Sequence, residues 1–128
     1  MKYMKANILL FILVIFSSSL FAQVKNISPK AAERKMHKEL TVLDVRTEAE
    51  FNSSHITGAV NYDVLDSIQF MQQIQELDKH ETYLVYCKSG KRSAKAAKWM
   101  EQQGFTHIYN MKEGILGWEK MQKKKNKN

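Results

Sequence analysis

The sequence predicts an α/β domain in which a central parallel sheet of about five strands carries helices on both faces. Short apolar, strand-like segments alternate with helix-like segments along the chain, and the connections between them are short. This alternation is typical of parallel strands joined by crossover helices. Pro29 is the only proline, and no repeat or internal linker interrupts the pattern. We therefore expect one folded domain over residues 23 to 121.

Residues 1 to 22 have the composition of a secretory signal peptide. Lys2 and Lys5 precede an apolar stretch from Ile8 to Phe16, small polar residues follow, and Ala22 stands at the expected cleavage position. The unbroken apolar core is shorter than the roughly 18 residues that a spanning helix needs. We therefore expect cleavage near Ala22 and export to the periplasm or the extracellular space. An uncleaved membrane anchor is the alternative.

The net charge of +7 comes from the two ends of the chain. Residues 23 to 119 carry equal numbers of acidic and basic side chains, and the excess lies in the first segment and in the lysine-rich end. A neutral domain predicts neither a nucleic-acid partner nor stable membrane contact after signal cleavage. We expect residues 122 to 128 to form a solvated basic tail, with contact to anionic surfaces as the alternative. We also expect a monomer.

The first strand and helix are predicted over residues 24 to 40. Residues 24 to 28 form a short strand-like segment whose apolar residues are Val24 and Ile27. Ser28 and Pro29 have the residue types of an N-cap and a first helical residue. Spacing of four then gives the helix one apolar stripe, formed by Ala32, Met36 and Leu40.

The next segment predicts two strands with a short helix between them. Residues 40 to 45 form an aliphatic and β-branched run, which suits a strand buried on both faces. Thr47 and Glu50 have the spacing of a capping box, so a short helix should begin there. Gly58 predicts a turn before a third strand over residues 59 to 62.

The second half of the domain predicts three helices and two strands. Asp66 or Ser67 can cap a helix whose apolar positions are Ile68, Met71, Ile74 and Leu77. Residues 81 to 87 form the strongest strand, followed by a helix with Ala94, Ala97 and Met100 facing inward and Gly104 at its end. Residues 106 to 111 predict the fifth strand, and residues 114 to 121 a last helical turn or two.

Cys87 is the only cysteine and stands where the strongest strand ends. A lone thiol in an exported chain is either buried and inert or reactive, and the cysteine count alone does not decide between the two. Its position favours function, because ligands of parallel sheets bind outside the carboxyl ends of the strands. The segment from Cys87 to Ser93 can point backbone N–H groups inward at the start of a helix, with Ser93 as the predicted cap. Gly90 permits the required turn.

This loop predicts an activated thiolate. The N–H donors and the cations Lys88, Lys91 and Arg92 favour ionisation of Cys87. A nucleotide-binding P-loop would need glycine at 85 and serine or threonine at 92, where the chain has Val85 and Arg92. Cysteine phosphatases place arginine six positions after the cysteine, whereas here it follows at five. A second cysteine for a C-x-x-C motif is absent from the sequence.

Three segments together resemble the rhodanese-like, single-domain sulfurtransferases, over about residues 24 to 121. The segment VLDVRTEAEFNSSHITGAVN (42 to 61) is similar to the family's first motif, and CKSGKRS (87 to 93) is similar to its active-site loop. KEGILGW (112 to 118) approximates its closing motif. Ser54 and Glu113 stand where the family commonly has glycine.

The resemblance implies a mechanism that uses Cys87 as catalytic nucleophile. The thiolate attacks the outer sulfur of a small anionic donor such as thiosulfate, releases sulfite and becomes a persulfide. Cyanide, a thiol or a protein then accepts the sulfur, and the reaction needs neither a metal nor an organic cofactor. The implied donor-binding residues are Lys88, Ser89, Gly90, Lys91 and Arg92, with loop amides stabilising the persulfide and Arg92 holding the donor.

Other residues are assigned supporting roles. We expect Asp44 to bind loop amides and Arg46 to pair with Glu50. His55 is interpreted as a turn residue, and the remaining histidines lack metal-ligand spacing. Trp99 and Trp118 are interpreted as packing residues.

Two other functions remain as hypotheses. One is a sulfur-carrier or binding module that a partner loads and that turns over little by itself. The other is a cysteine phosphatase or arsenate reductase, which the resemblance disfavours because relatives of that kind have a seven-residue loop.

Overall fold

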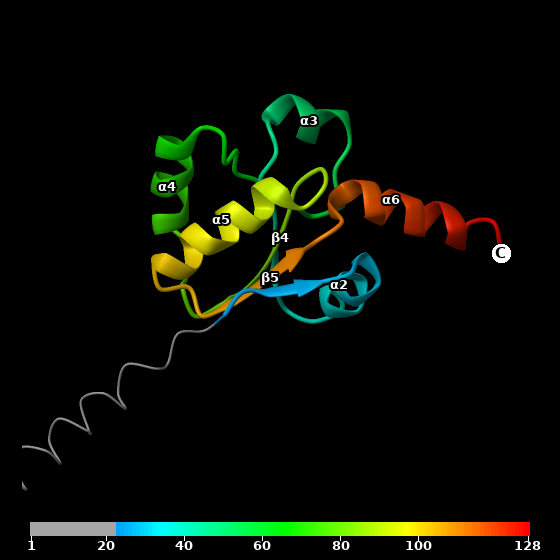
Figure 1. The fold of residues 1–128 in the computed structure, drawn as a ribbon, viewed down its shortest axis with the longest axis horizontal. Helices are drawn as coiled ribbons and strands as arrows, with labels where there is room; N and C mark the ends of the chain where they lie inside the picture. The colour runs from blue at the N-terminus through cyan, green and yellow to red at the C-terminus, as the bar shows by residue number, and fades with distance from the viewer. Residues whose placement is uncertain (1–22) are drawn as a thin grey trace, which may run out of the picture.

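The computed structural model describes residues 23–128 and contains one five-stranded parallel sheet (Figure 1). The predicted signal peptide lies outside the described residues. The strands lie in the order β1-β5-β4-β2-β3, and every neighbouring pair is parallel. Their bounds are Lys25–Ile27 (β1), Thr41–Asp44 (β2), Val60–Asn61 (β3), Thr82–Tyr86 (β4) and His107–Met111 (β5). The predicted α/β class and parallel sheet are confirmed.

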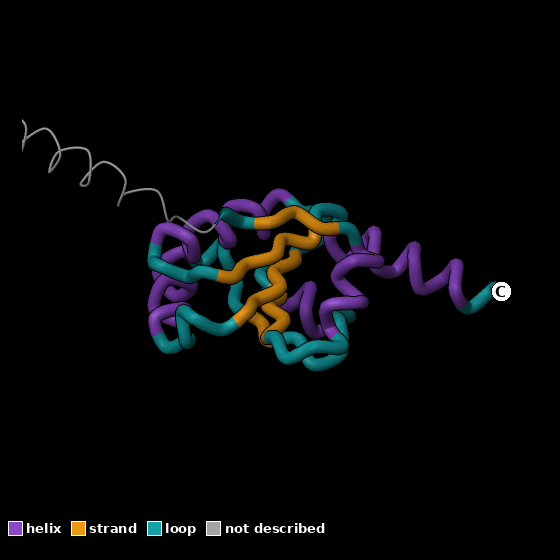
Figure 2. Tube along the Cα trace, turned by 90° about the horizontal axis from the view of Figure 1, so that it is seen from below, coloured by secondary structure: helices purple, strands orange, loops and turns teal. Residues whose placement is uncertain are grey.

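Helices cover both faces of the sheet, as Figure 2 shows from below. Their bounds are Pro29–Met36 (α2), Glu48–Ser53 (α3), Ser67–Gln75 (α4), Lys91–Gln102 (α5) and Gly114–Lys125 (α6). Side chains of α4 and α5 pack with Leu43, Tyr83 and Val85 on one face. Side chains of α2 and α6 pack with Leu84 and Tyr86 on the other. Alternate residues of β4 therefore serve opposite halves of the core, which is why this strand is apolar throughout.

The predicted helix starts are confirmed at three places. The hydroxyl of Ser28 accepts the N–H of Ala31, Thr47 accepts that of Glu50, and the Asp66 carboxylate accepts that of Gln69. Each bond satisfies an N–H group that has no partner inside its own helix. These caps are local in sequence, so residue type and spacing were enough to predict them.

The buried faces of α4 and α5 differ from the prediction. Ile68 is 75% exposed, whereas Phe70 and Ile74 are fully buried. Phe70 and Ile74 are four residues apart and share one helix face, and Ile68 lies in the first turn on another face. In α5, Ala94 is exposed and the buried face consists of Ser93, Ala96, Ala97 and Met100.

The C-terminal helix is longer than predicted. α6 continues through Gln122 to Lys125 instead of ending near residue 121. The Gln122 side-chain amide and the Lys125 ammonium both donate to the Glu33 carboxylate of α2. The segment expected to be a solvated tail is thus helical for its first four residues.

Candidate functional site

The loop that carries Cys87 begins at the carboxyl end of β4, the middle strand of the sheet. Cys87 follows Tyr86 directly and is only 1% exposed. The chain turns at Gly90, whose φ is +105°, and α5 begins at Lys91. The predicted strand-end position of Cys87 is confirmed, and the sulfur lies at the base of a closed loop rather than on its rim.

Donors from the loop converge on the Cys87 sulfur. The Gly90 N–H donates to Sγ at 3.1 Å. The Ser93 hydroxyl lies 3.4 Å from Sγ and 3.1 Å from the Gly90 carbonyl oxygen. Ser93 was predicted to cap α5, but Gly90 occupies the cap position and the Ser93 side chain faces the sulfur instead. The prediction was wrong because the helix begins two residues before Ser93.

The pKa of Cys87 reflects two opposing effects. Burial raises the pKa by disfavouring the charged thiolate. The Ser93 hydroxyl and the backbone N–H groups of Ser93, Gly90 and Ser89 lower it, and their combined effect leaves the pKa below its ordinary value. Hydrogen-bond donors can stabilise a buried thiolate in this way, and the thiolate is the nucleophilic form.

The first turn of α6 fixes the shape of the loop. The N–H groups of Ile115 and Leu116 donate to the carbonyl oxygens of Cys87 and Lys88, at 2.9 and 3.2 Å. Gly114 has a φ of +57°, and a Cβ atom there would lie 2.3 Å from the Lys88 carbonyl oxygen. Glu113, which replaces a glycine common in the family, has an ordinary φ of −101°. This position therefore does not need glycine, whereas Gly114 does.

Gly90 approaches a second piece of backbone. A Cβ atom at Gly90 would lie 2.1 Å from the carbonyl oxygen of Lys112, which follows β5. The positive φ and this contact both require glycine. Gly90 and Gly114 thus allow the loop to approach the backbone at the end of β5 and the start of α6.

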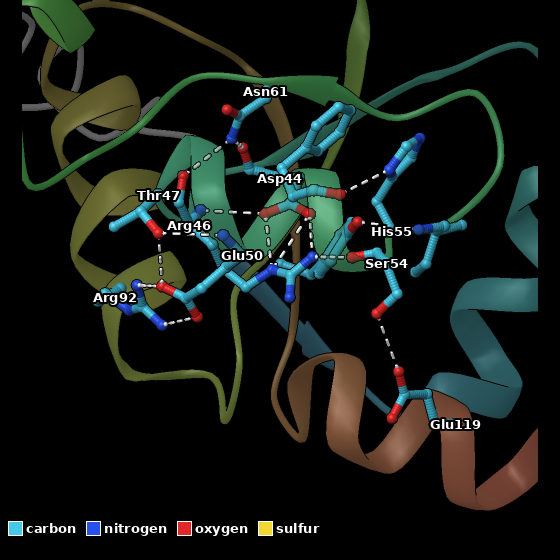
Figure 3. Close-up of polar contacts among 12 residues, drawn as sticks. Asp44, Arg46, Thr47, Glu50, Ser54, His55, Asn61, Arg92 and Glu119 are labelled. Atoms are coloured by element: carbon cyan, nitrogen blue, oxygen red, sulfur yellow. Dashed lines mark hydrogen bonds and ion pairs between the residues drawn. The ribbon is translucent and has the colours of Figure 1, made fainter.

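Asp44 and Arg46 form a buried ion pair beside the loop (Figure 3). Arg46 Nη2 lies 2.7 Å from Asp44 Oδ2, and the Arg46 backbone N–H donates to Asp44 Oδ1 at 3.0 Å. Arg46 was predicted to pair with Glu50, and this prediction was wrong. The predicted role of Asp44 in binding a loop amide is confirmed. Burial lowers the pKa of Arg46. The hydrogen bonds and the charge of Asp44 raise it by more, so the net shift is upward.

Arg46 also anchors the segment between α3 and β3. Its Nη2 donates to the Ser54 carbonyl oxygen at 2.6 Å. Ser54 has extended backbone with a φ of −166°, so glycine is not required there. The ion pair is buried and satisfied on several sides, which favours a structural role for both residues.

Arg92 is paired with Glu50, the residue that was assigned to Arg46. Arg92 Nη1 lies 2.7 Å from Glu50 Oε1, and Arg92 Nη2 lies 3.0 Å from Glu50 Oε2. The Thr47 hydroxyl donates to Glu50 Oε1 at 3.1 Å. The hydrogen bond with Arg92 is the main cause that lowers the pKa of Glu50 to about 2. The arginine that was predicted to hold the donor therefore already has a carboxylate partner.

The remaining predicted donor-binding residues lie at the mouth of the loop. The side chains of Lys88, Ser89 and Lys91 are exposed. A groove of about 420 Å³ opens beside Lys88 and is lined in part by Arg46, Glu50, Leu116 and Glu119. The exposed ammonium groups of Lys88 and Lys91 and this groove are the features that an approaching anion would meet.

The sequence assigned no role to Tyr86 and the wrong partner to Glu50. The buried Tyr86 hydroxyl accepts the Ile56 N–H at 3.1 Å, and its ring lies 5.7 Å from the Arg46 guanidinium. Burial, the largest cause, raises the pKa of Tyr86. Glu50 was predicted to begin a helix and to pair with Arg46, but not to pair with Arg92. The capping spacing identified its local contact, but nothing in the sequence indicated its partner 42 positions away.

The histidines show no metal-binding arrangement. His55 Nδ1 lies 2.8 Å from the Phe51 carbonyl oxygen, and its ring stacks on that of Phe51. Among residues 23–128, no cluster of His, Cys, Asp or Glu could hold a metal ion. No helix in this part of the chain is long and apolar enough to cross a membrane.

A family model for the rhodanese-like domain matches residues 28–121. Over 106 residues the chain is 33% identical to the Bacillus subtilis protein named "Putative sulfurtransferase YtwF", covering 81% of this chain and 99% of that one. It is 32% identical to the B. subtilis "Putative sulfur carrier protein YrkF", covering 80% of this chain and 55% of the relative. It is 34% identical to the tRNA uridine(34) hydroxylase of Pelagibacter ubique, covering 78% of this chain but 34% of that protein.

The fold is also similar to that of a solved rhodanese-like domain. The crystal structure of a rhodanese-like domain protein from Staphylococcus aureus superposes with a TM-score of 0.66 at 28% identity, covering 74% of this chain and 91% of that one. The chain spans only part of some curated relatives but nearly all of YtwF. On the match over residues 28–121 and this shared fold, the chain belongs to the rhodanese-like domain family.

Proposed function

We propose that this protein is a sulfurtransferase in which Cys87 carries the transferred sulfur as a persulfide. The observation that carries this proposal is the pair of donors on the Cys87 sulfur, the Gly90 N–H and the Ser93 hydroxyl. They offset the burial of the thiol and lower its pKa. A buried thiol with a lowered pKa, closed in a loop of N–H groups, suits nucleophilic attack followed by storage of a second, anionic sulfur.

In the first half-reaction, the Cys87 thiolate attacks the outer sulfur of the donor. A bond forms between Cys87 Sγ and that sulfur, and the bond between the donor's two sulfurs breaks with its electron pair. With thiosulfate as donor the leaving group is sulfite, and Cys87 retains the outer sulfur as a persulfide anion. The exposed ammonium groups of Lys88 and Lys91 can attract the anion to the mouth of the loop.

In the second half-reaction, a nucleophile attacks the outer sulfur of the persulfide. Cyanide takes the sulfur as thiocyanate, whereas a thiol or a protein cysteine takes it as a new persulfide. Cys87 leaves as a thiolate, stabilised again by the Gly90 N–H and the Ser93 hydroxyl. The cycle is complete without net oxidation of the protein.

Replacement of Cys87 by serine tests the assignment. Cys87→Ser should abolish sulfur transfer from thiosulfate to cyanide while leaving the thermal unfolding transition within a few degrees of the wild type. The buried volume hardly changes, so a folded but inactive protein is expected. Undiminished turnover in the folded variant would refute the proposal.

A sulfur-carrier module is a second candidate, favoured by the relative that is named a sulfur carrier. Such a module would receive sulfur from a partner protein and would turn over slowly alone. Steady-state kinetics with thiosulfate and a small thiol separate the two functions. An enzyme continues to turn over at excess donor and acceptor, whereas a pure carrier loads one sulfur for each Cys87 and stops.

We further propose that the protein is exported. Support comes from the order of charged, apolar and small residues in residues 1 to 22, which ends at Ala22. Expression of the full chain in a bacterial host, followed by fractionation and N-terminal sequencing, should find a protein that begins at Gln23 outside the cytoplasm. An uncleaved chain in the membrane fraction would support the anchor instead.

A further inference from the structure

We propose that Glu50 determines donor specificity, because its contact with Arg92 makes the site poorly suited to small dianions and better suited to less negative persulfides. The inference rests on the proposed sulfur-transfer function and narrows its substrate class. Glu50 would act through Arg92 and is thus a positioning residue.

The geometry of the pair uses the edge of Arg92 that would otherwise bind an anion. Both terminal nitrogens of Arg92 donate to Glu50, one to each carboxylate oxygen, at 2.7 and 3.0 Å. Paired, parallel hydrogen bonds of this kind are strong and directional. The Thr47 hydroxyl donates to the same carboxylate, and Thr47 also accepts the Glu50 N–H. Glu50 is therefore held in place from its own helix, and Arg92 meets a carboxylate that is already oriented.

The pair lies where it can influence the donor. Arg92 is the second residue of α5, directly after the turn at Gly90, and it feels the charge of Cys87. Glu50 also lines the groove that opens beside Lys88. Figure 3 shows Arg92 and Glu50 pointing toward each other from α5 and α3. An anion that approaches the loop would thus meet a neutral pair rather than a free guanidinium.

Protonation does not open the pair at neutral pH. Arg92 lowers the pKa of Glu50 to about 2, so the carboxylate remains charged. A dianionic donor must therefore compete with Glu50 for Arg92 or depend on Lys88 and Lys91, which are exposed. Attraction by exposed lysines is weak because water and salt screen it. A donor with fewer negative charges depends less on these cations and is repelled less by Glu50.

Both donor classes support the same balanced step. With thiosulfate, the thiolate takes the outer sulfur and sulfite leaves with the electron pair. With a persulfide in its protonated form, RSSH, the thiolate takes the outer sulfur and RS⁻ leaves with the electron pair. Cys87 retains the transferred sulfur in either case, and only the charge of the leaving fragment differs. Donor charge can therefore be varied without changing the chemistry at Cys87.

Two donors test the inference in the folded protein. Thiosulfate carries two negative charges, whereas the persulfide of cysteamine carries an ammonium group. Glu50→Gln should lower KM for thiosulfate about threefold to tenfold, the range that a partly exposed ion pair can supply. KM for cysteamine persulfide should change less than twofold, and kcat should be retained with both. Glu48→Gln is the matched control, because Glu48 is exposed in the same helix and its replacement should change neither KM.

The outcomes separate this inference from the function on which it rests. If wild-type protein transfers sulfur but Glu50→Gln shifts KM equally for both donors, or lowers kcat alone, Glu50 is merely structural and the inference fails. If wild-type protein transfers sulfur from neither donor, the proposed function itself fails. Should Glu50→Gln not fold, Glu50→Asp withdraws the carboxylate from Arg92 by one methylene. It should lower KM for thiosulfate in the same direction by a smaller factor, and an unchanged KM would overturn the inference.

Discussion

Cys87 is a residue whose reactivity depends on a balance between burial and hydrogen bonding. With 1% of its surface exposed, the thiol would normally resist ionisation. The Ser93 hydroxyl and three backbone N–H groups reverse this effect and lower the pKa. The reactive form is therefore stabilised by the Ser93 hydroxyl, the largest of the causes that lower the pKa, together with the backbone N–H groups of the loop.

Replacement of Ser93 should measure the side-chain part of this balance. In Ser93→Ala the pKa of Cys87 should rise, because the thiolate loses one of the hydrogen bonds that stabilise it. The measurement is the pH dependence of iodoacetamide alkylation, whose midpoint should move upward. Ser89→Ala is the control, because only the backbone N–H of Ser89 acts on the sulfur. An unchanged midpoint in Ser93→Ala would contradict the assigned role.

Charged partners are the residue-scale feature that the sequence predicted least well. The two ion pairs, Asp44–Arg46 and Glu50–Arg92, lie within segments whose strands and helices were predicted. Asp44 and its partner are only two positions apart. Glu50 is also close to Arg46 in the sequence, so sequence separation alone does not exclude that pair. Which carboxylate Arg46 binds depends on the path of the chain after β2 and on the position of α5, which brings Arg92 to Glu50. Neither feature is contained in local spacing.

At the scale of elements, the active loop is shaped by the helix that follows β5 rather than by its own residues alone. Two N–H groups at the start of α6 hold the carbonyl oxygens of Cys87 and Lys88. Gly114 allows this approach by its positive φ and its lack of a side chain. The closing sequence motif is thus part of the active site, although it lies more than twenty residues after Cys87.

Gly114→Ala should reduce sulfur transfer by more than the backbone strain of a left-handed φ would cause. A left-handed φ costs a residue with a side chain about 1–2 kcal/mol. The new Cβ would also collide with the backbone of Cys87 and Lys88, so we expect sulfur transfer to fall at least tenfold. Gly58→Ala is the control, because φ there is +84° but nothing lies within 4 Å of the added Cβ.

Both variants should lose stability from the left-handed φ, as measured by thermal unfolding, and Gly114→Ala should lose more because its Cβ also meets the loop backbone. Only Gly114→Ala should lose transfer activity. Equal activity in both variants would show that the contact between α6 and the loop does not govern the site.

The elements themselves were largely predictable from the sequence. Apolar runs identified the strands, and residue types at the helix starts identified Ser28, Thr47 and Asp66 as caps. Side-chain orientation was less predictable, because it depends on where each helix begins. A start at Lys91 instead of Ser93 turns Ser93 toward the sulfur and Ala94 toward solvent. The error is confined to the first turn, because Ala97 and Met100 are buried as predicted.

At the scale of the whole molecule, the ion pair between α3 and α5 links stability to pH. The pKa of Glu50 falls from an ordinary 4.5 to about 2 on folding. A lowered folded pKa contributes stability that is present above about pH 4.5 and is lost as the pH falls through about 2. Glu50 is 30% exposed, so solvent screening limits the contribution to about 1 kcal/mol.

Denaturant unfolding of wild-type protein and Glu50→Gln at several pH values checks this linkage. The difference in the free energy of unfolding should be constant above about pH 5 and should vanish toward pH 2. Glu48→Gln should show no such dependence, since no ion pair of that side chain is found among residues 23–128. A difference that persisted at pH 2 would mean that Glu50 stabilises the fold other than by its charge.

The arrangement of the whole molecule concentrates chemistry at one edge of the sheet. Cys87, the Asp44–Arg46 pair and the Glu50–Arg92 pair all lie at or just beyond the carboxyl ends of β2 and β4. These neighbouring strands pair in parallel, so their carboxyl ends meet at one edge. The sequence predicted this edge because it predicted the alternation of strands and helices.

The central claim is that Cys87 accepts a sulfur atom and gives it up again, and intact-mass spectrometry tests both steps. After incubation with thiosulfate, the wild-type protein should gain the mass of one sulfur atom, and later addition of cyanide should remove it. Cys87→Ser should gain nothing under the same conditions. Wild-type protein that stays unmodified, or sulfur that is also gained by Cys87→Ser, would contradict the account.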